Sequence, residues 1–308
     1  MKKLFYLFMV TMCAIAFTAC SDDDNTKDPI DDDNGGEEMI TAVYESEYEF
    51  DLELNIGTFK EGENITIAWG DGGVSEFKSF AITDSWGYYG NDELHYAIGQ
   101  DMVKHKYPDY NAHTITIKGK IKEFYCYDVL TYLDVSKCTA LVNLYCGDND
   151  ISSLDVSNCT ALTELECFAN NLTSLDISKN TALTHLRCST NYISSLDVSK
   201  CTALTKLSCS DNNLTSLDVS KNTALTELSC GGNNLTSLDV SKNTALTELW
   251  CHNNNLSADA LNKIFNDLPQ GKKVNDGYYS QSTIYIYNNP GTNTCDKSIA
   301  TNKGWRVQ

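Results

Sequence analysis

The stretch LTSLDVSKNTALTELSC, from Leu214 to Cys230, decides the fold because nearly the same letters return 21 residues earlier and 21 residues later. Each copy follows a version of the pattern Leu-x-x-Leu-x-Cys-x-x-Asn-x-Leu-x-x-Leu-Asp-Val-Ser. The copies open at Leu141, Leu162, Leu183, Leu204, Leu225 and Leu246, and a shorter one opens at Ile121. A period of this length is typical of a chain that stacks one structural unit on the next.

The pattern resembles the leucine-rich repeat family, and in particular its internalin-like members. The resemblance implies a solenoid over residues 120–256, with a parallel sheet on its concave face. The physics of the pattern agrees, because one turn cannot bury its own leucines whereas stacked turns bury each other's. We also predict an internal asparagine ladder whose amides satisfy backbone groups at the turn after each strand. Its members are Asn149, Asn170, Asn191, Asn212, Asn233 and Asn254.

Three further columns repeat with the same period. Cys126, Cys146, Cys167, Cys188, Cys209, Cys230 and Cys251 stand where the family usually has a core leucine. We predict that these thiols point inward and pack as small hydrophobes; a metal or redox role is the alternative. Cys138, Cys159 and Cys201 alternate with Asn180, Asn222 and Asn243, which predicts a tight buried turn. The aspartates from Asp134 to Asp239 predict turn capping with a charge ladder, or alternatively cation binding.

The first residues are typical of a signal peptide, here residues 1–19. Lys2 and Lys3 precede an apolar run that ends in Phe17-Thr18-Ala19-Cys20. The run is shorter than the roughly 20 residues that span a bilayer, and an uncleaved membrane anchor is the alternative. The last four residues resemble a bacterial lipobox, which implies a lipid on Cys20 and attachment to the outer membrane.

Residues 20–39 are predicted to be a solvated, lipidated tether. Residues 21–39 hold nine carboxylates and one lysine, a composition that cannot bury apolar area. Acidic residues just after the lipidated cysteine resemble the surface-export signal of Bacteroidota lipoproteins, which implies that the chain faces the cell exterior. A plain tether is the alternative. The net charge of −19 argues against a nucleic-acid partner.

Residues 40–119 alternate apolar and polar side chains, as in Tyr48 to Leu54 and Thr114 to Ile117, which predicts half-buried strands. The turn Trp69-Gly70-Asp71-Gly72 and the His105-x-Tyr107 strand resemble the polycystic-kidney-disease (PKD) type of β-sandwich. That family implies an extracellular module, which serves as a spacer or binds glycans. We predict that His105 is a structural hydrogen-bonding residue rather than a catalyst.

Residues 257–308 are predicted to form a helix–strand cap. Ser257 to Leu268 has apolar residues at helical spacing, and Pro269 follows as a stop. Ile284, Ile286 and Asn289 repeat the spacing of a last, modified turn. Such a cap covers the core and strand edges that an open solenoid end would expose.

The outward positions of the predicted strands vary between copies while the scaffold does not. We therefore predict a partner-binding face on the concave sheet, with exposed aromatic anchors clustered at its N-terminal end. Shielding of the junction with the β-sandwich is the alternative for these rings. The predicted binding residues are Tyr125, Tyr127, Tyr145, Glu164, Glu166, Phe168, His185, Arg187 and Trp250.

Three functions stay open. The main prediction is a mainly β, surface-exposed lipoprotein that adheres to an extracellular protein. The alternative is a glycan-binding accessory lipoprotein whose loop residues Trp86, Tyr88 and Tyr89 stack on sugar rings, and a structural spacer is the third. The sequence has no Gly-x-Ser-x-Gly, His-Glu-x-x-His or phosphate-loop motif, so we predict no enzyme, no cofactor and no metal site.

Overall fold

The computed structural model of the chain describes residues 38–45, 52–58, 64–78, 103–127, 130–271 and 281–308. All of these belong to one compact unit. The predicted signal peptide, Cys20 and the tether up to residue 37 lie outside the described residues, as does the aromatic loop with Trp86, Tyr88 and Tyr89. Within the described residues, no helix is long and apolar enough to cross a membrane.

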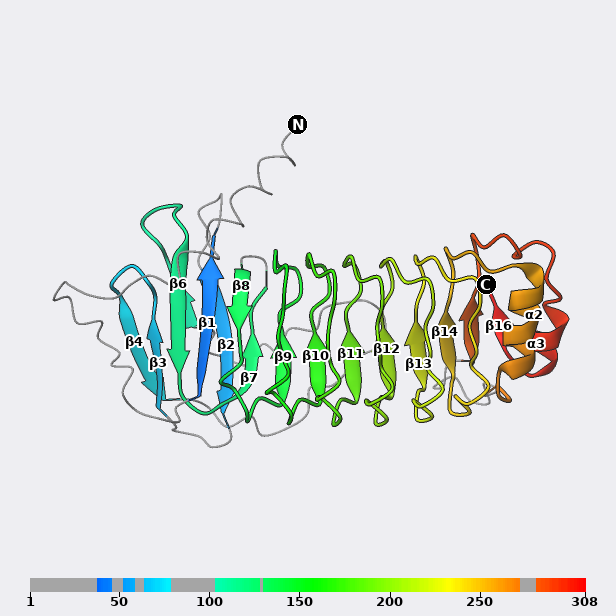
Figure 1. Cartoon of the computed structure of the whole chain (residues 1–308), viewed down its shortest axis with the longest axis horizontal. Helices are drawn as coiled ribbons and strands as arrows, with labels where there is room; N and C mark the ends of the chain where they lie inside the picture. The colour runs from blue at the N-terminus through cyan, green and yellow to red at the C-terminus, as the bar shows by residue number, and fades with distance from the viewer. Residues whose placement is uncertain (1–37, 46–51, 59–63, 79–102, 128–129, 272–280) are drawn as a thin grey trace. The chain divides into compact units, whose positions relative to one another are not determined.

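The repeats form a parallel sheet with one short strand per turn (Figure 1). Its strands are β7 (Ile121–Tyr125), β9 (Asn143–Tyr145), β10 (Glu164–Glu166), β11 (His185–Arg187), β12 (Lys206–Ser208), β13 (Glu227–Ser229), β14 (Glu248–Trp250), β15 (Thr283–Tyr285) and β16 (Arg306–Val307). Leu165, Leu186 and Leu207 lie opposite one another across β10 to β12, which is the register that the 21-residue period predicts. The predicted fold class, a mainly β chain with a parallel solenoid, is confirmed.

The inward side chains of the strands form a continuous core of leucines and cysteines. Leu186 and Cys188, for example, have no exposed surface. All ten cysteines from Cys126 to Cys251 in the described residues are buried and free. Burial raises the pKa of the Cys188 and Cys230 thiols to about 12, so they stay protonated at neutral pH. The prediction of inward-facing, buried thiols is confirmed.

The asparagine ladder is confirmed, and it joins each turn to the one before it. Asn212 Oδ1 accepts from the backbone N–H of Ile193 at 3.0 Å, and its Nδ2 donates to the carbonyl of Cys188 at 3.0 Å. The residue just before each ladder asparagine has a left-handed backbone, as at Thr190 with φ 55° and Gly232 with φ 63°. The ladder therefore holds the chain in the sharp turn that ends each strand.

The second cysteine–asparagine column is also confirmed as a buried turn site. Asn180 Nδ2 donates to the carbonyls of Val156 and Cys159 at 2.9 and 2.8 Å, while Cys159 Sγ donates to the carbonyl of Val135 at 3.3 Å. Either side chain can therefore donate to a carbonyl of the preceding turn, which explains why the sequence alternates between them.

The aspartate column caps turns, as predicted. Asp197 Oδ1 accepts from the backbone N–H of Ser199 at 2.9 Å, and the same bond recurs from Asp134 to Asp239. The N–H and the hydroxyl of Ser199 hold the pKa of Asp197 below its ordinary value. In the described residues, no group of three or more His, Cys, Asp or Glu side chains is placed to hold a metal ion.

The N-terminal region contains two sheets that both continue into the first turn of the solenoid. One sheet has the order β4-β3-β6-β1-β8. In the other sheet, β2 pairs antiparallel with β7, and β5 pairs antiparallel with the other edge of β2. The strands are β1 (Met39–Tyr44), β2 (Leu52–Thr58), β3 (Asn64–Ala68), β4 (Val74–Lys78), β5 (Val103–His105), β6 (His113–Lys118) and β8 (Leu130–Asp134). Strand pairing therefore closes this end of the solenoid.

Glu38 adds a polar anchor at the same place. Its carboxylate accepts from the backbone N–H groups of Ile121 at 3.1 Å and Ala140 at 2.9 Å. Glu38 belongs by sequence to the acidic stretch after Cys20, yet it hydrogen-bonds to the first turn of the solenoid. Glu38, at the end of the acidic stretch, is thus fixed to the first turn of the repeats.

The C-terminal cap is built as predicted, with one helix added. Helix α2 (Ala258–Asp267) begins at Ser257, whose hydroxyl accepts from the Ala260 N–H at 3.2 Å. The short helix α3 (Ser298–Asn302) was not predicted. Trp305 is buried, and its indole N–H donates to the carbonyl of Pro269 at 2.8 Å. These contacts cover the last turn of the core, as Figure 1 shows at the C-terminal end.

Candidate binding face

The outward side chains of β7 to β15 form three rows across the parallel sheet. Because side chains alternate along a strand, the residues flanking each inward leucine and cysteine all point away from the core. The register places Tyr125 beside Tyr145 and Trp250 beside Tyr285 in the middle row. All nine predicted partner-binding residues lie on these rows, on five of the strands or directly after them.

Four rings gather at the N-terminal end, as predicted. The Tyr125 ring centroid lies 4.3 Å from that of Tyr127 and 6.2 Å from that of Tyr145, and the Tyr127 ring lies 5.9 Å from Phe168. Gly147 leaves the space for Phe168, since a Cβ there would lie 2.5 Å from the ring. We call these four residues the N-terminal aromatic cluster.

The prediction that these rings are exposed is wrong, because each ring packs against its neighbours and is half-buried. Exposed large hydrophobic side chains of the described residues lie elsewhere, at Val74, Tyr110, Tyr132, Tyr192 and Tyr287. The N-terminal aromatic cluster is therefore a fixed surface, and its side chains lose little conformational freedom if a ligand covers them.

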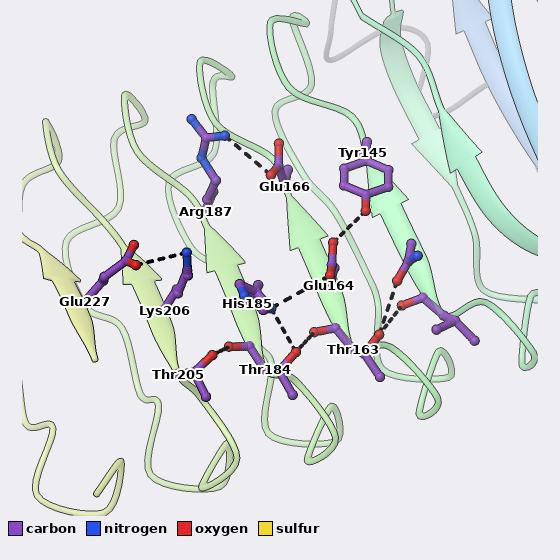
Figure 2. Close-up of polar contacts among 12 residues, drawn as sticks. Tyr145, Thr163, Glu164, Glu166, Thr184, His185, Arg187, Thr205, Lys206 and Glu227 are labelled. Atoms are coloured by element: carbon purple, nitrogen blue, oxygen red, sulfur yellow. Dashed lines mark hydrogen bonds and ion pairs between the residues drawn. The ribbon is translucent and has the colours of Figure 1, made fainter. Parts of the chain in front are cut away.

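Charged side chains beside the cluster are paired with one another (Figure 2). Tyr145 Oη donates to Glu164 Oε2 at 2.6 Å, and His185 Nδ1 lies 3.8 Å from Glu164 Oε1. Farther along the sheet, Lys206 Nζ lies 2.9 Å from Glu227 Oε1. These contacts fix the positions of the charged side chains on the face.

Arg187 joins the charges to the rings. Its guanidinium lies 4.9 Å from the Phe168 ring centroid, and Nη1 lies 3.4 Å from Glu166 Oε1. Burial raises the pKa of Glu166, although Arg187 acts against that shift. Burial also lowers the pKa of His185 against the opposing effect of Glu164.

Threonines below the first row tie neighbouring strands together. The hydroxyl of Thr184 donates to the carbonyl of Thr163 at 3.1 Å, and Thr205 repeats this bond to Thr184 (Figure 2). The strands that carry Glu164, His185 and Lys206 are therefore held in register by side-chain as well as backbone bonds. The geometry of the charged pairs follows from this spacing.

A second group of rings lies at the C-terminal end, apart from the first. Trp250 stacks on Tyr285 with centroids 5.5 Å apart and planes 4° apart, and His252 stacks on Tyr287 at 4.3 Å. Gly231 makes room for His252 as Gly147 does for Phe168, since a Cβ would lie 2.6 Å from the ring. We call these four residues the C-terminal aromatic cluster.

Only Trp250 of this second cluster was predicted to bind a partner. It does not join the N-terminal aromatic cluster, because β11 to β13 separate β14 from β10. Between the two clusters the outward rows carry the charged or polar His185, Arg187, Lys206 and Glu227 together with the small residues Ser189, Ser208, Ser210, Ser229 and Gly231. The spacing of Ile284, Ile286 and Asn289 was the signal that would have placed Tyr285 and Tyr287 on the outward rows.

His105 lies in the N-terminal region and has a structural setting. Its Nε2 lies 2.7 Å from Asp71 Oδ2, and its ring stacks on Trp69 at 4.5 Å. Tyr107 Oη donates to the carbonyl of Trp69 at 2.9 Å. Each group therefore supports the turn at Gly70, whose φ of 82° suits glycine. The contacts fit the predicted structural role of His105.

Comparisons with known proteins find similar solved structures only. No protein-family model and no curated protein matches the chain. The functional domain of InlJ from Listeria monocytogenes, which includes a cysteine ladder, is 32% identical, with a TM-score of 0.44 over 60% of this chain and 49% of that one. The internalin InlF of the same organism is 20% identical, with a TM-score of 0.49 over 56% of this chain and 48% of that one.

A third similar structure is internalin C2 of Listeria monocytogenes. It is 21% identical, with a TM-score of 0.46 over 61% of this chain and 81% of that one. The chain spans about half the length of the InlJ and InlF structures. These neighbours are internalin-type leucine-rich repeat proteins.

Proposed function

We propose that the chain is a surface-exposed lipoprotein, attached to the outer membrane through Cys20, that binds an extracellular protein non-covalently through its concave face. One observation carries the proposal. Inward columns repeat almost unchanged from turn to turn, whereas the outward rows combine two aromatic clusters with paired charges. Packing explains the first property but not the second.

The chemistry of the outward rows suits a protein partner. Half-buried aromatic rings and arginine are the side chains that most often dominate protein–protein affinity. Arg187 lies against Phe168 of the N-terminal aromatic cluster, on the side of β11. A partner that covers this region would exclude water from Glu166 and Arg187, which strengthens their electrostatic contacts.

Binding rather than catalysis is the role that these residues favour. The carboxylates of Glu164 and Glu166 lie beside Tyr145, His185 and Arg187 in hydrogen bonds or ion pairs. A general acid or base needs instead a free path to a substrate proton. Attachment at Cys20 and display at the surface rest on the sequence of residues 17–39.

The test is a binding screen of the full chain against two panels, extracellular host proteins and gut polysaccharides. Tyr145→Ala and Phe168→Ala are expected to weaken binding of a protein ligand at least about tenfold, since hot-spot truncations cost about 2 kcal/mol or more. Circular dichroism and thermal melting would confirm that both variants fold. Unchanged affinity in both folded variants would remove the concave face from the proposal.

Trp86→Ala serves as the control for the glycan alternative. Trp86 lies outside the repeat sequence of residues 120–256, so protein binding is expected to survive this change. Retention of a polysaccharide that Trp86→Ala abolishes and Phe168→Ala leaves intact would move the function to the N-terminal region and make the repeats a spacer.

A further inference from the structure

Apart from Glu123 and Tyr125 of β7, two strands of the concave sheet carry a glutamate and an aromatic ring in the same relation. Glu166 precedes Phe168 by two residues after β10, and Glu248 precedes Trp250 by two residues on β14. Side chains two residues apart on a strand share a face and lie roughly 7 Å apart. Each pair therefore offers a carboxylate and a ring to one neighbouring group.

At the first pair, the chain itself provides that neighbour. Arg187 comes from the next strand, β11, with its guanidinium 4.9 Å from the Phe168 ring centroid and 3.4 Å from Glu166 Oε1. The positive charge is thus shared between a carboxylate and a ring face. Cation–π contact and charge pairing both stabilise this arrangement.

At the second pair, the next strand provides no positive charge. Thr283 and Tyr285 of β15 lie opposite Glu248 and Trp250. On the other side, the ammonium of Lys206 lies 2.9 Å from Glu227. The backbone N–H of Glu248 donates to the carbonyl of Thr226 at 3.1 Å, but across the described ranges of the chain its carboxylate makes no hydrogen bond or ion pair.

The electrostatics of Glu248 agree with this geometry. Burial and the negative charge of the neighbouring Glu227 raise the pKa of Glu248. The positive charge of Lys206 acts in the opposite direction, but the pKa stays above its ordinary value. Glu248 is half-buried, so its carboxylate is partly desolvated without a partner. A cation from a ligand would therefore interact more strongly with this carboxylate than with a fully solvated one.

The rings next to Glu248 form a flat stack. Trp250 and Tyr285 lie almost parallel, and both are half-buried. Tryptophan is the side chain that attracts cations most strongly through its ring face. The stack therefore places an aromatic ring face beside a carboxylate, as Phe168 does beside Glu166 for Arg187.

We propose that Glu248, Trp250 and Tyr285 form a subsite for a positively charged side chain, arginine or lysine, of the protein partner. This assignment rests on the proposed function, because the partner brings the charge. It reproduces between two proteins the contact that Glu166, Phe168 and Arg187 make within one.

A peptide probe tests the subsite without the partner. Acetyl-Gly-Arg-Gly-amide would be titrated into the full, ¹⁵N-labelled chain while the indole N–H signal of Trp250, identified with Trp250→Phe, is followed by NMR. The control peptide has citrulline, which keeps the shape of arginine and lacks its charge. We expect a saturable shift with the arginine peptide and binding of the citrulline peptide at least about tenfold weaker, as for the loss of a charge-assisted bond.

Glu248→Gln is the decisive variant, since it keeps the size of the side chain and removes the charge. It is expected to weaken binding of the arginine peptide at least about tenfold. Glu76→Gln, the control, removes an exposed carboxylate of β4 and is expected to leave the affinity for the peptide unchanged. Thermal melting would confirm that Glu248→Gln folds. Equal shifts with both peptides, or unchanged affinity in folded Glu248→Gln, would overturn the subsite.

The two proposals fail separately. If the peptide result is negative while Phe168→Ala still weakens a protein ligand, the concave face binds a partner without this subsite. If the arginine peptide binds through Glu248 and no protein of the panel binds the chain, the subsite stands and the choice of partner class is wrong.

Discussion

The inward and outward sides of the same short strands obey different rules. Leu186 and Cys188 face inward from β11 and its end, and both repeat at the equivalent places of β10 and β12. His185 and Arg187 face outward from the same strand, and the neighbouring strands have Glu164 and Glu166 on one side and Lys206 and Ser208 on the other. Four consecutive residues, from His185 to Cys188, thus contribute both to the core and to the outward face.

The difference shows which positions stacking constrains. An inward side chain meets copies of itself above and below, so a size or polarity that suits one turn suits all of them. An outward side chain meets its neighbours on one face only, and its other face is open. Variation there costs the fold little, which leaves the rows free to be shaped by a ligand.

The largest expected effect comes from breaking an inward column. Asn212→Ala removes the acceptor of the Ile193 N–H and a donor to the Cys188 carbonyl, and both groups are buried. Unsatisfied buried groups cost about 1–3 kcal/mol each, so we expect a loss of about 3–5 kcal/mol in the free energy of unfolding, measured by chemical denaturation. Asn213→Ala is the control, because Asn213 is exposed. Equal losses in the two variants would contradict the role of the ladder.

The corner between strand and turn should respond in the opposite direction. Thr190 is held at φ 55°, a conformation that is unfavourable for a β-branched residue, and a later copy has Gly232 at this place. Thr190→Gly is therefore expected to raise the free energy of unfolding by about 0.5–1 kcal/mol.

Asn253→Gly is the matched control for the corner. Asn253 has φ 51°, but asparagine tolerates this conformation better than threonine does. We expect no gain in unfolding free energy from Asn253→Gly. A gain as large as that of Thr190→Gly would show that backbone strain at Thr190 is not the cause.

The smallest effect concerns the aspartates that cap the turns. The pKa of Asp197 is lowered by the N–H and hydroxyl of Ser199 from an ordinary value of 3.8. The unfolded chain therefore binds the proton more readily than the folded chain, so this stabilisation is present above pH 3.8 and is lost as the pH falls through the lower folded pKa.

Asp197→Asn keeps an oxygen that can accept from the Ser199 N–H and removes the titration. We expect nearly unchanged thermal stability at pH 7 and a shallower loss of stability in acid, measured by melting curves between about pH 2 and 5. An acid response identical to that of the unsubstituted chain would show that the capping bond does not depend on the charge of Asp197.

The repeat itself could be predicted from the sequence in detail. The period fixed the register of β9 to β14, because each inward leucine must lie over the next one. The asparagine and cysteine columns followed from the same stacking. Nine outward residues could be placed on the concave face for the same reason.

Contacts that join distant segments could not be predicted. The pairing of β2 with β7 and of β1 with β8 links residues with no shared local pattern. The half-buried state of Phe168 depends on a missing side chain at Gly147, one turn away. Tyr285 was missed because the outward rows were predicted only as far as Trp250, although the spacing of Ile284, Ile286 and Asn289 marks a further turn.

One pair of variants tests most directly whether the outward rows bind and the inward columns hold the fold. Phe168→Ala and Leu186→Ala each truncate one large side chain, on the outward and the inward side of adjacent strands. The measurement is the Kd for a protein ligand found in the screen, together with the free energy of unfolding. We predict that Phe168→Ala raises the Kd at least about tenfold with little loss of stability, and that Leu186→Ala costs about 2–5 kcal/mol of stability with an unchanged Kd. The reverse pattern, or the same pattern in both variants, would contradict the division of the strands into a structural and a binding side.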